Sequence, residues 1–336
     1  EYVPTSFKHG SLVIDEPPKR ILTLEDQEEA IVGNLTCMRT VRPKESQERI
    51  TCFHNIMEAL YHLSVDNLTH VANTYIPGNS TSEHDIEIRD AIADALGAMA
   101  TNDSLTLLTN LVLTPEQKDA KLILRTLFHF FGLESPPPQI VIETVENMCF
   151  KWKMEFHDEE DGLHVWTRAH LLLGTLAGVI HPTDPARANT IIDRLHGMVE
   201  IHDPWKHRQL RSTLTEEEYS SHLHEKATIL GALGNAGMDR SYDYFLSYIN
   251  STEAPSVLKR TSLTALKSYD HEKAADEILR VAIEDPDGHV RYAAALDYLG
   301  HPRASKLWTV QQQINDRYHN QTAIAAGREK RGLSDS

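Results

Sequence analysis

The sequence has no hydrophobic run long enough to cross a membrane. A membrane-spanning helix needs about 20 consecutive, mainly apolar residues. The most apolar stretch, residues 171–180, is half that length and lies between His170 and His181. We therefore expect no transmembrane segment in this chain.

Basic residues are also scarce. The 336 residues include 33 Lys and Arg against 49 Asp and Glu, which gives a formal net charge of −16. Nucleic-acid binding requires an excess of positive charge to meet the phosphates. The charge balance thus argues against nucleic acid as a partner, while the 40% hydrophobic content is ordinary for a globular protein.

Familiar catalytic motifs are missing. The sequence contains no Gly-x-Gly-x-x-Gly, phosphate-binding loop, Gly-x-Ser-x-Gly or His-Glu-x-x-His pattern. The triple acidic run at residues 216–218 follows Thr215 and is typical of a helix N-terminus. The aromatic residues at 242, 244, 245 and 248 are typical of packing. We expect no enzyme activity and no cofactor in this chain.

The 19 histidines require a search for metal ligands. His222 and His224 are two residues apart, which places their rings on different faces of a helix. A zinc pair on one helix needs a spacing of three or four residues. His202 and His207 flank a tryptophan in an expected loop, and His157 precedes an acidic run at residues 158–161 in another expected loop. We expect none of these to form a functional metal site.

Sequons for N-glycosylation are unusually frequent. The pattern Asn-x-Ser/Thr occurs at six of the 13 Asn residues, whereas chance gives roughly two. This excess predicts passage through the secretory pathway and an extracellular location. The six sites are Asn34, Asn67, Asn79, Asn102, Asn250 and Asn320.

Two further features accompany a secreted protein. Arg328, Lys330 and Arg331 form an Arg-x-Lys-Arg pattern that proprotein convertases of the furin type cleave, here after Arg331. An exposed charged tail is the alternative, but the position of the pattern in a polar stretch after the last predicted helix favours cleavage. Of the three cysteines, Cys37 and Cys52 are the expected disulfide pair. Cys149 is left over, either as a buried thiol or as a bridge to a region outside this chain.

The start at Glu1 leads us to expect a processed or excised piece of a longer polypeptide.

Helical patterns dominate after the first 50 residues. Residues 7–14 are a candidate strand before Pro17 and Pro18, and we expect residues 1–50 to be a linker or the end of a preceding β-sheet domain. From Ile50 onward apolar residues recur at spacings of three and four, which predicts an amphipathic helix. Further helices are expected over residues 65–75, 85–100, 104–113, 115–131, 140–149, 163–180 and 186–198.

An internal repeat indicates how these helices are arranged. Similar hexamers beginning Ala-Leu end a predicted helix at residues 59–64, 95–100, 232–237, 265–270 and 295–300. The first two begin 36 residues apart, and the last three begin 33 and 30 residues apart. Two helices per ~30–45 residues is typical of HEAT-like or armadillo-like arrays. We therefore predict an all-α solenoid of stacked helical hairpins over residues 51–309, followed by a polar tail at 310–336. A closed helical bundle is the alternative.

The helical part resembles the helical domain of the large lipid transfer proteins, the family of vitellogenins, apolipophorins, apolipoprotein B and the microsomal triglyceride transfer protein. The resemblance rests on residues 53–68, on residues 85–100 through the Pro136 break, and on residues 232–237 with the later Arg-Tyr-Ala-Ala-Ala at Arg291. It implies a two-layered helical arch that wraps lipid-binding β-sheets elsewhere in the same precursor.

The expected function follows from that resemblance. It implies the helical scaffold of a secreted lipid-transport or yolk-type lipoprotein, with lipid as cargo of the full assembly and a proprotein convertase as processing partner. The alternative from another class is an extracellular structural, clotting or matrix glycoprotein that uses the same arch without lipid. A weaker third hypothesis is a convertase-processed module that binds a cell-surface receptor.

Overall fold

The computed structural model describes residues 24–40, 47–76, 83–133, 135–152, 156, 158–201 and 212–304. No β-strand occurs among these residues, and the predicted all-α solenoid is confirmed. The candidate strand at residues 7–14 lies outside the described residues. The helices are α1 (Leu24–Thr40), α2 (Gln47–Tyr61), α3 (Val65–Tyr75), α4 (Glu83–Met99), α5 (Asn102–Val112), α6 (Ala120–Phe131), α7 (Gln139–Phe150), α8 (Glu159–Ile180), α9 (Pro185–Ile201), α11 (Glu216–Ala236), the short 3-10 helix η1 (Asp239–Ser241), α12 (Tyr242–Ile249), α13 (Ser256–Leu266), α14 (Glu272–Glu284) and α15 (Gly288–Leu299).

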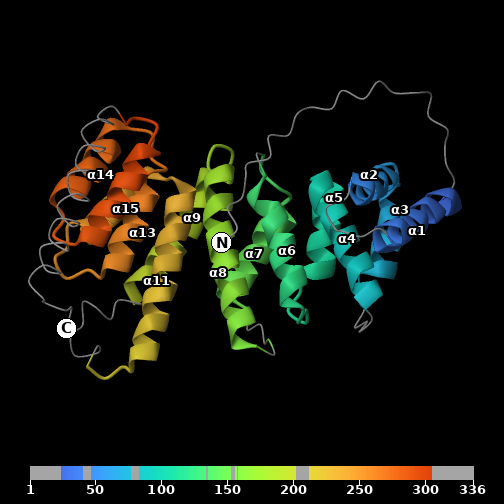
Figure 1. The fold of residues 1–336 in the computed structure, drawn as a ribbon, viewed down its shortest axis with the longest axis horizontal. Helices are drawn as coiled ribbons and strands as arrows, with labels where there is room; N and C mark the ends of the chain where they lie inside the picture. The colour runs from blue at the N-terminus through green and yellow to red at the C-terminus, as the bar shows by residue number, and fades with distance from the viewer. Residues whose placement is uncertain are drawn as a thin grey trace, which may run out of the picture.

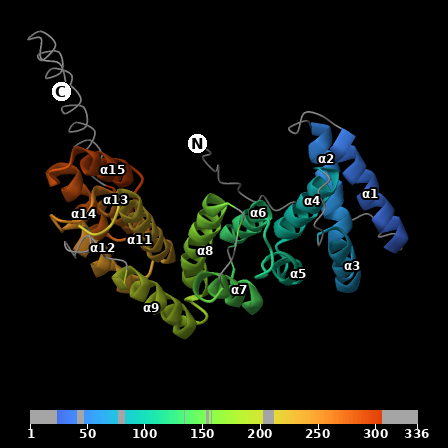
Figure 2. The same ribbon diagram turned by 90° about the horizontal axis from the view of Figure 1, so that it is seen from below.

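The helices pack in two layers that follow the chain from one end of the molecule to the other (Figure 1). The inner layer is a continuous series in which each helix contacts the next: α2, α4, α6, α8, α11, α13 and α15. The outer layer contains α3, α5, α7, α9, α12 and α14, each packed against its hairpin partner. Figure 2 shows that the row bends into an arch with α2, α4, α6 and α8 on its inner side.

The hexamer repeat marks the ends of inner-layer helices. The five hexamers coincide with the C-terminal ends of α2, α4, α11, α13 and α15. Ala95, Ala232, Ala265 and Ala295 at the first hexamer position are all buried, since a small side chain lets neighbouring helices approach closely. Gly237, the last residue of its hexamer, has φ 59° and ends α11 in the left-handed conformation that favours glycine.

Helical structure begins earlier than the sequence patterns predicted. We expected a linker or the end of a β-sheet domain over residues 1–50, but α1 occupies 24–40 and α2 starts at Gln47. Ile31 and Leu35 lie one turn apart on α1, and both are buried. Most of the remaining α1 residues are polar, so this narrow apolar stripe escaped detection although it packs α1 against α2 and α4.

Two predicted helix starts were wrong because aspartates cap these helices. We expected a helix from Pro115, but α6 begins at Ala120, where the Asp119 carboxylate accepts a hydrogen bond from the Leu122 amide at 3.1 Å. Residues 158–161 were expected in a loop. Asp158 instead caps α8 by accepting from the Glu160 amide at 2.9 Å, and the acidic residues after it lie in the first turn. Carboxylates there are favoured by the helix dipole.

The predicted helix N-terminus after Thr215 is confirmed. Thr215 and Glu218 form a reciprocal capping box, in which each side chain accepts a hydrogen bond from the other residue's amide. The Thr215 amide and the Thr215 hydroxyl both donate to the Glu218 carboxylate, and these hydrogen bonds hold the pKa of that carboxyl below its usual value. The acidic run therefore defines the start of α11.

A buried ion pair ties the last described hairpin to α13, and an arginine holds the turn within that hairpin. Lys259 on α13 and Asp285 after α14 form an ion pair at 2.9 Å with little exposure of either side chain. Arg291 donates to the carbonyl oxygens of Asp285 at 2.6 Å and Pro286 at 2.9 Å. Arg291, a landmark of the family resemblance, thus fixes the turn between α14 and α15.

A close backbone contact lies between α8 and α11, near the middle of the arch. A Cβ atom on Gly174 would lie 1.9 Å from the Ala232 carbonyl oxygen, and one on Gly178 would lie 2.8 Å from the Ala236 carbonyl oxygen. Gly234 on α11 makes a similar approach to Ala265 on α13, at 2.5 Å from its Cβ. Glycine costs helix stability, but here it permits backbone contact that no larger residue allows.

We predict that Gly174→Ala destabilises the protein, because the added methyl group must push α8 and α11 apart. Overpacking of this kind costs about 1–3 kcal/mol. Urea unfolding of purified protein measures the change. The matched control is Gly197→Ala in α9, where an added methyl group would have no neighbouring atom within 4 Å; it should stabilise by about 0.5–1 kcal/mol. Equal effects of the two substitutions would contradict the close contact.

Candidate functional site

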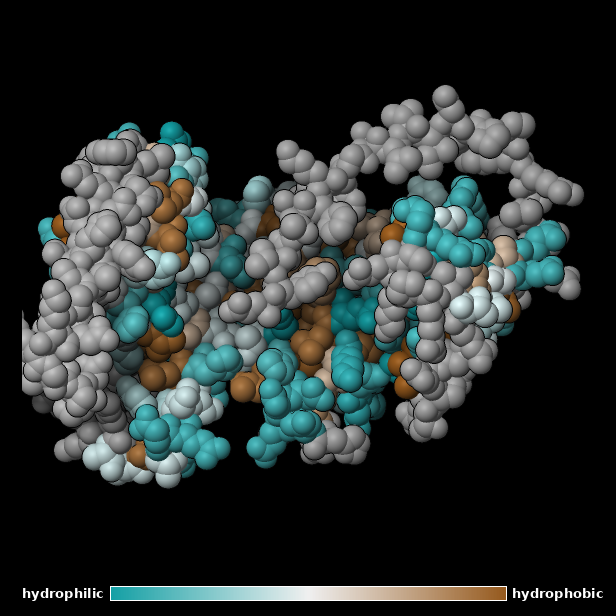
Figure 3. Space-filling view, in the orientation of Figure 1, coloured by the Kyte–Doolittle hydropathy of each residue, from teal (hydrophilic) through white to brown (hydrophobic). Residues whose placement is uncertain are grey.

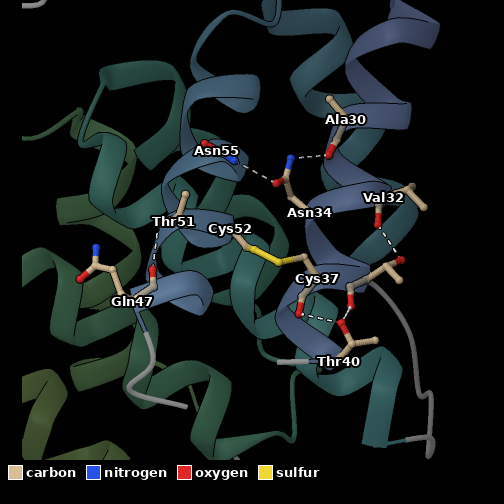
Figure 4. The surroundings of a disulfide bond; sticks show 10 residues. Ala30, Val32, Asn34, Cys37, Thr40, Gln47, Thr51, Cys52 and Asn55 are labelled. Atoms are coloured by element: carbon tan, nitrogen blue, oxygen red, sulfur yellow. Dashed lines mark hydrogen bonds between the residues drawn. A yellow bond between two sulfur atoms is a disulfide. The ribbon is translucent and has the colours of Figure 1, made fainter. Parts of the chain in front are cut away.

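A disulfide joins the first two helices. Cys37 on α1 and Cys52 on α2 are bonded, with their Cα atoms 6.2 Å apart (Figure 4). This is the pairing expected from the sequence. Asn34 lies one turn away on α1, where its Nδ2 donates to the Ala30 carbonyl at 2.7 Å and its Oδ1 accepts from Asn55 of α2 at 3.1 Å. A covalent bond and a polar contact therefore hold the hairpin at the N-terminal end of the inner layer.

We predict that the double substitution Cys37→Ser and Cys52→Ser loosens this hairpin. The disulfide spans a sequence separation of 15 residues, and closing a loop of that size is worth about 3 kcal/mol. Hydrogen exchange should accelerate in α1 and in the first half of α2, whereas amides of α8 and α11 keep their protection. Uniform acceleration along the whole arch would show that the disulfide acts globally instead.

The asparagine side chains of the sequons differ in their exposure to solvent. Asn102 is exposed at the first position of α5, and Asn250 is exposed at the end of α12, where its Oδ1 accepts from Arg280 at 2.5 Å. Asn67 is half-buried in the first turn of α3, and Asn34 has the interhelical contacts described above. Asn102 and Asn250 thus offer the most accessible side chains of the four. Asn79 and Asn320 lie outside the described residues, as do Arg328, Lys330 and Arg331 of the processing pattern.

The histidines considered as metal ligands are not brought together. His224 contacts the Thr167 hydroxyl on α8 at 3.0 Å, whereas His222 lies 3.7 Å from Glu225 on its own helix. No group of three or more His, Cys, Asp or Glu side chains with metal-binding geometry occurs in the described ranges. His157, His202 and His207 fall outside what can be described.

The aromatic residues of α12 pack as the sequence led us to expect. Phe245 and Tyr248 are almost fully buried, and the Tyr244 ring stacks on the His196 imidazole with ring centroids 5.0 Å apart. Tyr269 donates from its hydroxyl to the Met238 carbonyl at 2.8 Å, and burial raises the pKa of that phenol well above its usual value. These rings connect the outer layer to the inner one.

Cys149 is free and part-buried on α7. Burial is the main cause that raises the pKa of its thiol well above the ordinary value, with Arg194 lowering it and Glu146 raising it. A thiol that stays protonated at neutral pH is a poor nucleophile. The structure therefore favours the interpretation of Cys149 as a packed thiol.

His170 is a buried titratable group in the centre of the arch. Its side chain on α8 is fully buried, Nδ1 donates to the Trp166 carbonyl at 2.8 Å, and Nε2 has no hydrogen-bond partner among the described residues. Burial lowers the pKa of His170 from 6.5 to about 4. The imidazole is therefore neutral in the folded protein down to acidic pH.

We predict that His170 makes the fold acid-sensitive. Between pH 6.5 and about 4 the unfolded chain binds a proton at His170 and the folded chain does not. Stability should fall as pH falls through this window, by up to about 3 kcal/mol from this group. Urea unfolding at pH 7 and pH 5 should show a smaller loss in His170→Leu than in the parent. His164→Gln, an exposed change on the same helix, should keep the parental loss; equal losses in all three proteins would exclude His170 as the cause.

A cleft on the inner layer was not anticipated from the sequence. It has a volume of about 400 Å³ and lies between α2, α4 and α6. Asp94 on α4 pairs with Arg125 and His129 on α6, residues more than 30 positions away. Only the stacking of consecutive hairpins places these side chains together. We call this the α4 cleft; its lining residues are Phe53, Asp94, Ala98, Arg125, Phe128 and His129.

The arrangement as a whole is that of a two-layered helical solenoid, with an arch-shaped inner surface and one disulfide at its N-terminal end. Its sequence matches the family described as the vitellogenin TPR domain over residues 25–324. This match covers most of the chain, and the chain belongs to that family. The resemblance to the helical domain of the large lipid transfer proteins is thereby confirmed. No curated protein and no solved structure gives a match.

None of the helices in the described ranges is both long and apolar enough to span a membrane.

Proposed function

We propose that this chain is the helical scaffold of a secreted lipid-transport or yolk-type lipoprotein. The observation that carries the proposal is the match to the vitellogenin TPR domain along a continuous two-layered arch. In this role the inner layer supports lipid-binding sheets that lie elsewhere in the precursor. The chain itself performs no catalysis and holds no cofactor; lipid is cargo of the full assembly.

The shape of the arch supports a scaffold role. Each inner-layer helix contacts the inner-layer helix before or after it in the series and outer-layer helices beside it, so the curvature is built up one repeat at a time. The backbone contact between α8 and α11 permits little adjustment at the middle of the arch. A curved surface of this kind presents a long concave face to a partner domain.

Secretion and processing belong to the same proposal. Six sequons and a Cys37–Cys52 disulfide suit an oxidising, extracellular setting. We further propose that a proprotein convertase cleaves after Arg331 and that a cell-surface receptor is a partner of the full protein. These proposals concern the full-length precursor and do not depend on the helical fold described above.

Lipid content of the full-length secreted protein tests the central proposal. We predict that protein purified from the culture medium of eukaryotic cells carries extractable lipid in a fixed ratio to protein. Gly174→Val, which forces α8 and α11 apart, should reduce that ratio in whatever protein is still secreted. Gly197→Ala should leave it unchanged. Lipid-free protein with intact folding would overturn the carrier role and favour a structural, clotting or matrix glycoprotein.

A further inference from the structure

The Asn34 sequon lies inside a helix. Asn34, Leu35 and Thr36 occupy the second half of α1, which runs from residue 24 to 40. Side chains two positions apart on a helix do not face each other, so the Asn34 amide and the Thr36 hydroxyl point in different directions. The glycosylation pattern consists of these two side chains together. A helical α1 therefore cannot present both of them to one enzyme site.

Both side chains of the sequon are also engaged in hydrogen bonds (Figure 4). Asn34 Nδ2, the atom that would receive the sugar, donates to the Ala30 carbonyl at 2.7 Å, and Asn34 Oδ1 accepts from Asn55 of α2 at 3.1 Å. The Thr36 hydroxyl donates to the Val32 carbonyl at 2.9 Å. Glycan transfer to Asn34 therefore requires α1 to separate from α2 and to unwind around this residue.

The disulfide holds the same two helices at the same place. Cys37 lies three residues after Asn34 on α1, and Cys52 lies three residues before Asn55 on α2. Positions three apart are neighbours on a helix surface. The covalent bond and the Asn34–Asn55 contact therefore lie one turn apart across one helix pair, and the disulfide opposes the opening that would expose the sequon.

Burial in an apolar core does not protect Asn34. Its side chain is half-buried, and Thr36 and Asn55 are exposed. Figure 3 shows mainly hydrophilic side chains over the described part of α1 and α2, at the same end of the row as in Figure 1. The barrier to modification is therefore the helical hairpin conformation, and oxidation of the two cysteines makes that conformation harder to open.

Two other sequons serve as comparisons. Asn250 follows α12, and Thr252 lies outside the helices, so folding leaves this sequon free to be presented to an enzyme. Asn67 lies in α3, where the Thr69 hydroxyl donates to a carbonyl of its own helix at 2.7 Å. This sequon is closed by its helix as Asn34 is, but the disulfide between α1 and α2 does not hold it. Asn67 thus reports on helix folding without cysteine oxidation.

We propose that glycan transfer to Asn34 competes with formation of the Cys37–Cys52 disulfide, so that chains with the oxidised hairpin carry no glycan at this site. The inference rests on the proposed passage through the secretory pathway. It goes beyond that passage, because it makes modification of one sequon depend on whether the N-terminal hairpin has closed.

Each of the two competing reactions uses a reactant of that pathway. In glycan transfer, Asn34 Nδ2 forms a bond to C1 of an oligosaccharide carried on a lipid diphosphate. The bond from C1 to the diphosphate oxygen breaks, the lipid diphosphate leaves, and Nδ2 loses one proton. In oxidation, the thiols of Cys37 and Cys52 form one S–S bond and give two electrons and two protons to the disulfide of an oxidoreductase, which becomes a dithiol. The first reaction leaves a sugar at the contact between α1 and α2, and the second closes the sequon.

One tryptic peptide tests the proposal. Cleavage after Arg20 and Arg39 yields residues 21–39, which contain both Asn34 and Cys37. The chain is secreted from eukaryotic cells behind a signal peptide, free thiols are alkylated, and disulfides are reduced and alkylated with a second isotopic reagent. A glycosidase in heavy-oxygen water then marks each asparagine that carried a glycan. We expect mass spectrometry to find the disulfide label and the glycan mark on different molecules of this peptide.

Cys52→Ser should raise the occupancy of Asn34 about tenfold over the parent, because the loop that opposes opening of α1 is no longer closed. The matched control is Cys149→Ser, which removes the free cysteine and should keep the parental occupancy. Occupancy of Asn67 should be the same in all three proteins, which separates a local effect at the hairpin from a general loss of folding. Brief dithiothreitol treatment of cells that make the parent should raise Asn34 occupancy to the level of Cys52→Ser, and it should leave Cys52→Ser itself unchanged.

A glycan mark on peptides whose Cys37 carries the disulfide label would overturn the proposal. Equal rises at Asn34 and Asn67 in Cys52→Ser would do the same, as would no rise at Asn34 in that variant or after dithiothreitol. These outcomes leave the proposed secretory route intact. Lack of a glycan at every sequon, Asn250 included, would instead contradict the secretory route and this inference together.

Discussion

The arch depends on the backbone contact between α8 and α11. Gly174 and Gly178 on one helix face the carbonyl groups of Ala232 and Ala236 on the other at distances that exclude any Cβ. α8 is also the longest helix described, and it packs against α6, α7 and α9 as well as α11. Because the contact is made by backbone atoms, which cannot change rotamer, it fixes the relation between the N-terminal and C-terminal halves of the inner layer.

The two ends of the arch are stabilised differently from its centre. At the N-terminal end α1 buries Ile31 and Leu35 among its described side chains, and the Cys37–Cys52 disulfide adds a covalent link to α2. At the C-terminal end the buried Lys259–Asp285 pair and the carbonyl contacts of Arg291 hold the last hairpin. Within the described part of the chain, the first and last hairpins each pack against one neighbouring hairpin, and these bonds add to that contact.

Much of the fold was predictable because helix formation and helix ends depend on short-range patterns in the sequence. Apolar spacing of three and four indicated the helices, the Ala-Leu hexamers marked the ends of predicted helices, and the acidic run after Thr215 indicated a helix N-terminus. The errors have physical causes as well. α1 was missed because two buried residues one turn apart do not make a visible apolar face, and the starts of α6 and α8 were misplaced because Asp119 and Asp158 are caps.

The sequence by itself determined the helical repeat, the acidic charge, the sequons and the disulfide pair, since each rests on residue type and short-range spacing. Tertiary structure decided which glycines lie against the backbone of another helix. The sequence does not distinguish Gly174 from Gly197, but Gly174 faces the Ala232 backbone and Gly197 has no neighbouring atom within 4 Å of an added Cβ. It also decided that His170 is a neutral buried base and that Asp94 and Arg125, about one repeat apart, share a cleft. Burial and contact between hairpins depend on how the repeats curve, and that curvature is a property of the stacked array.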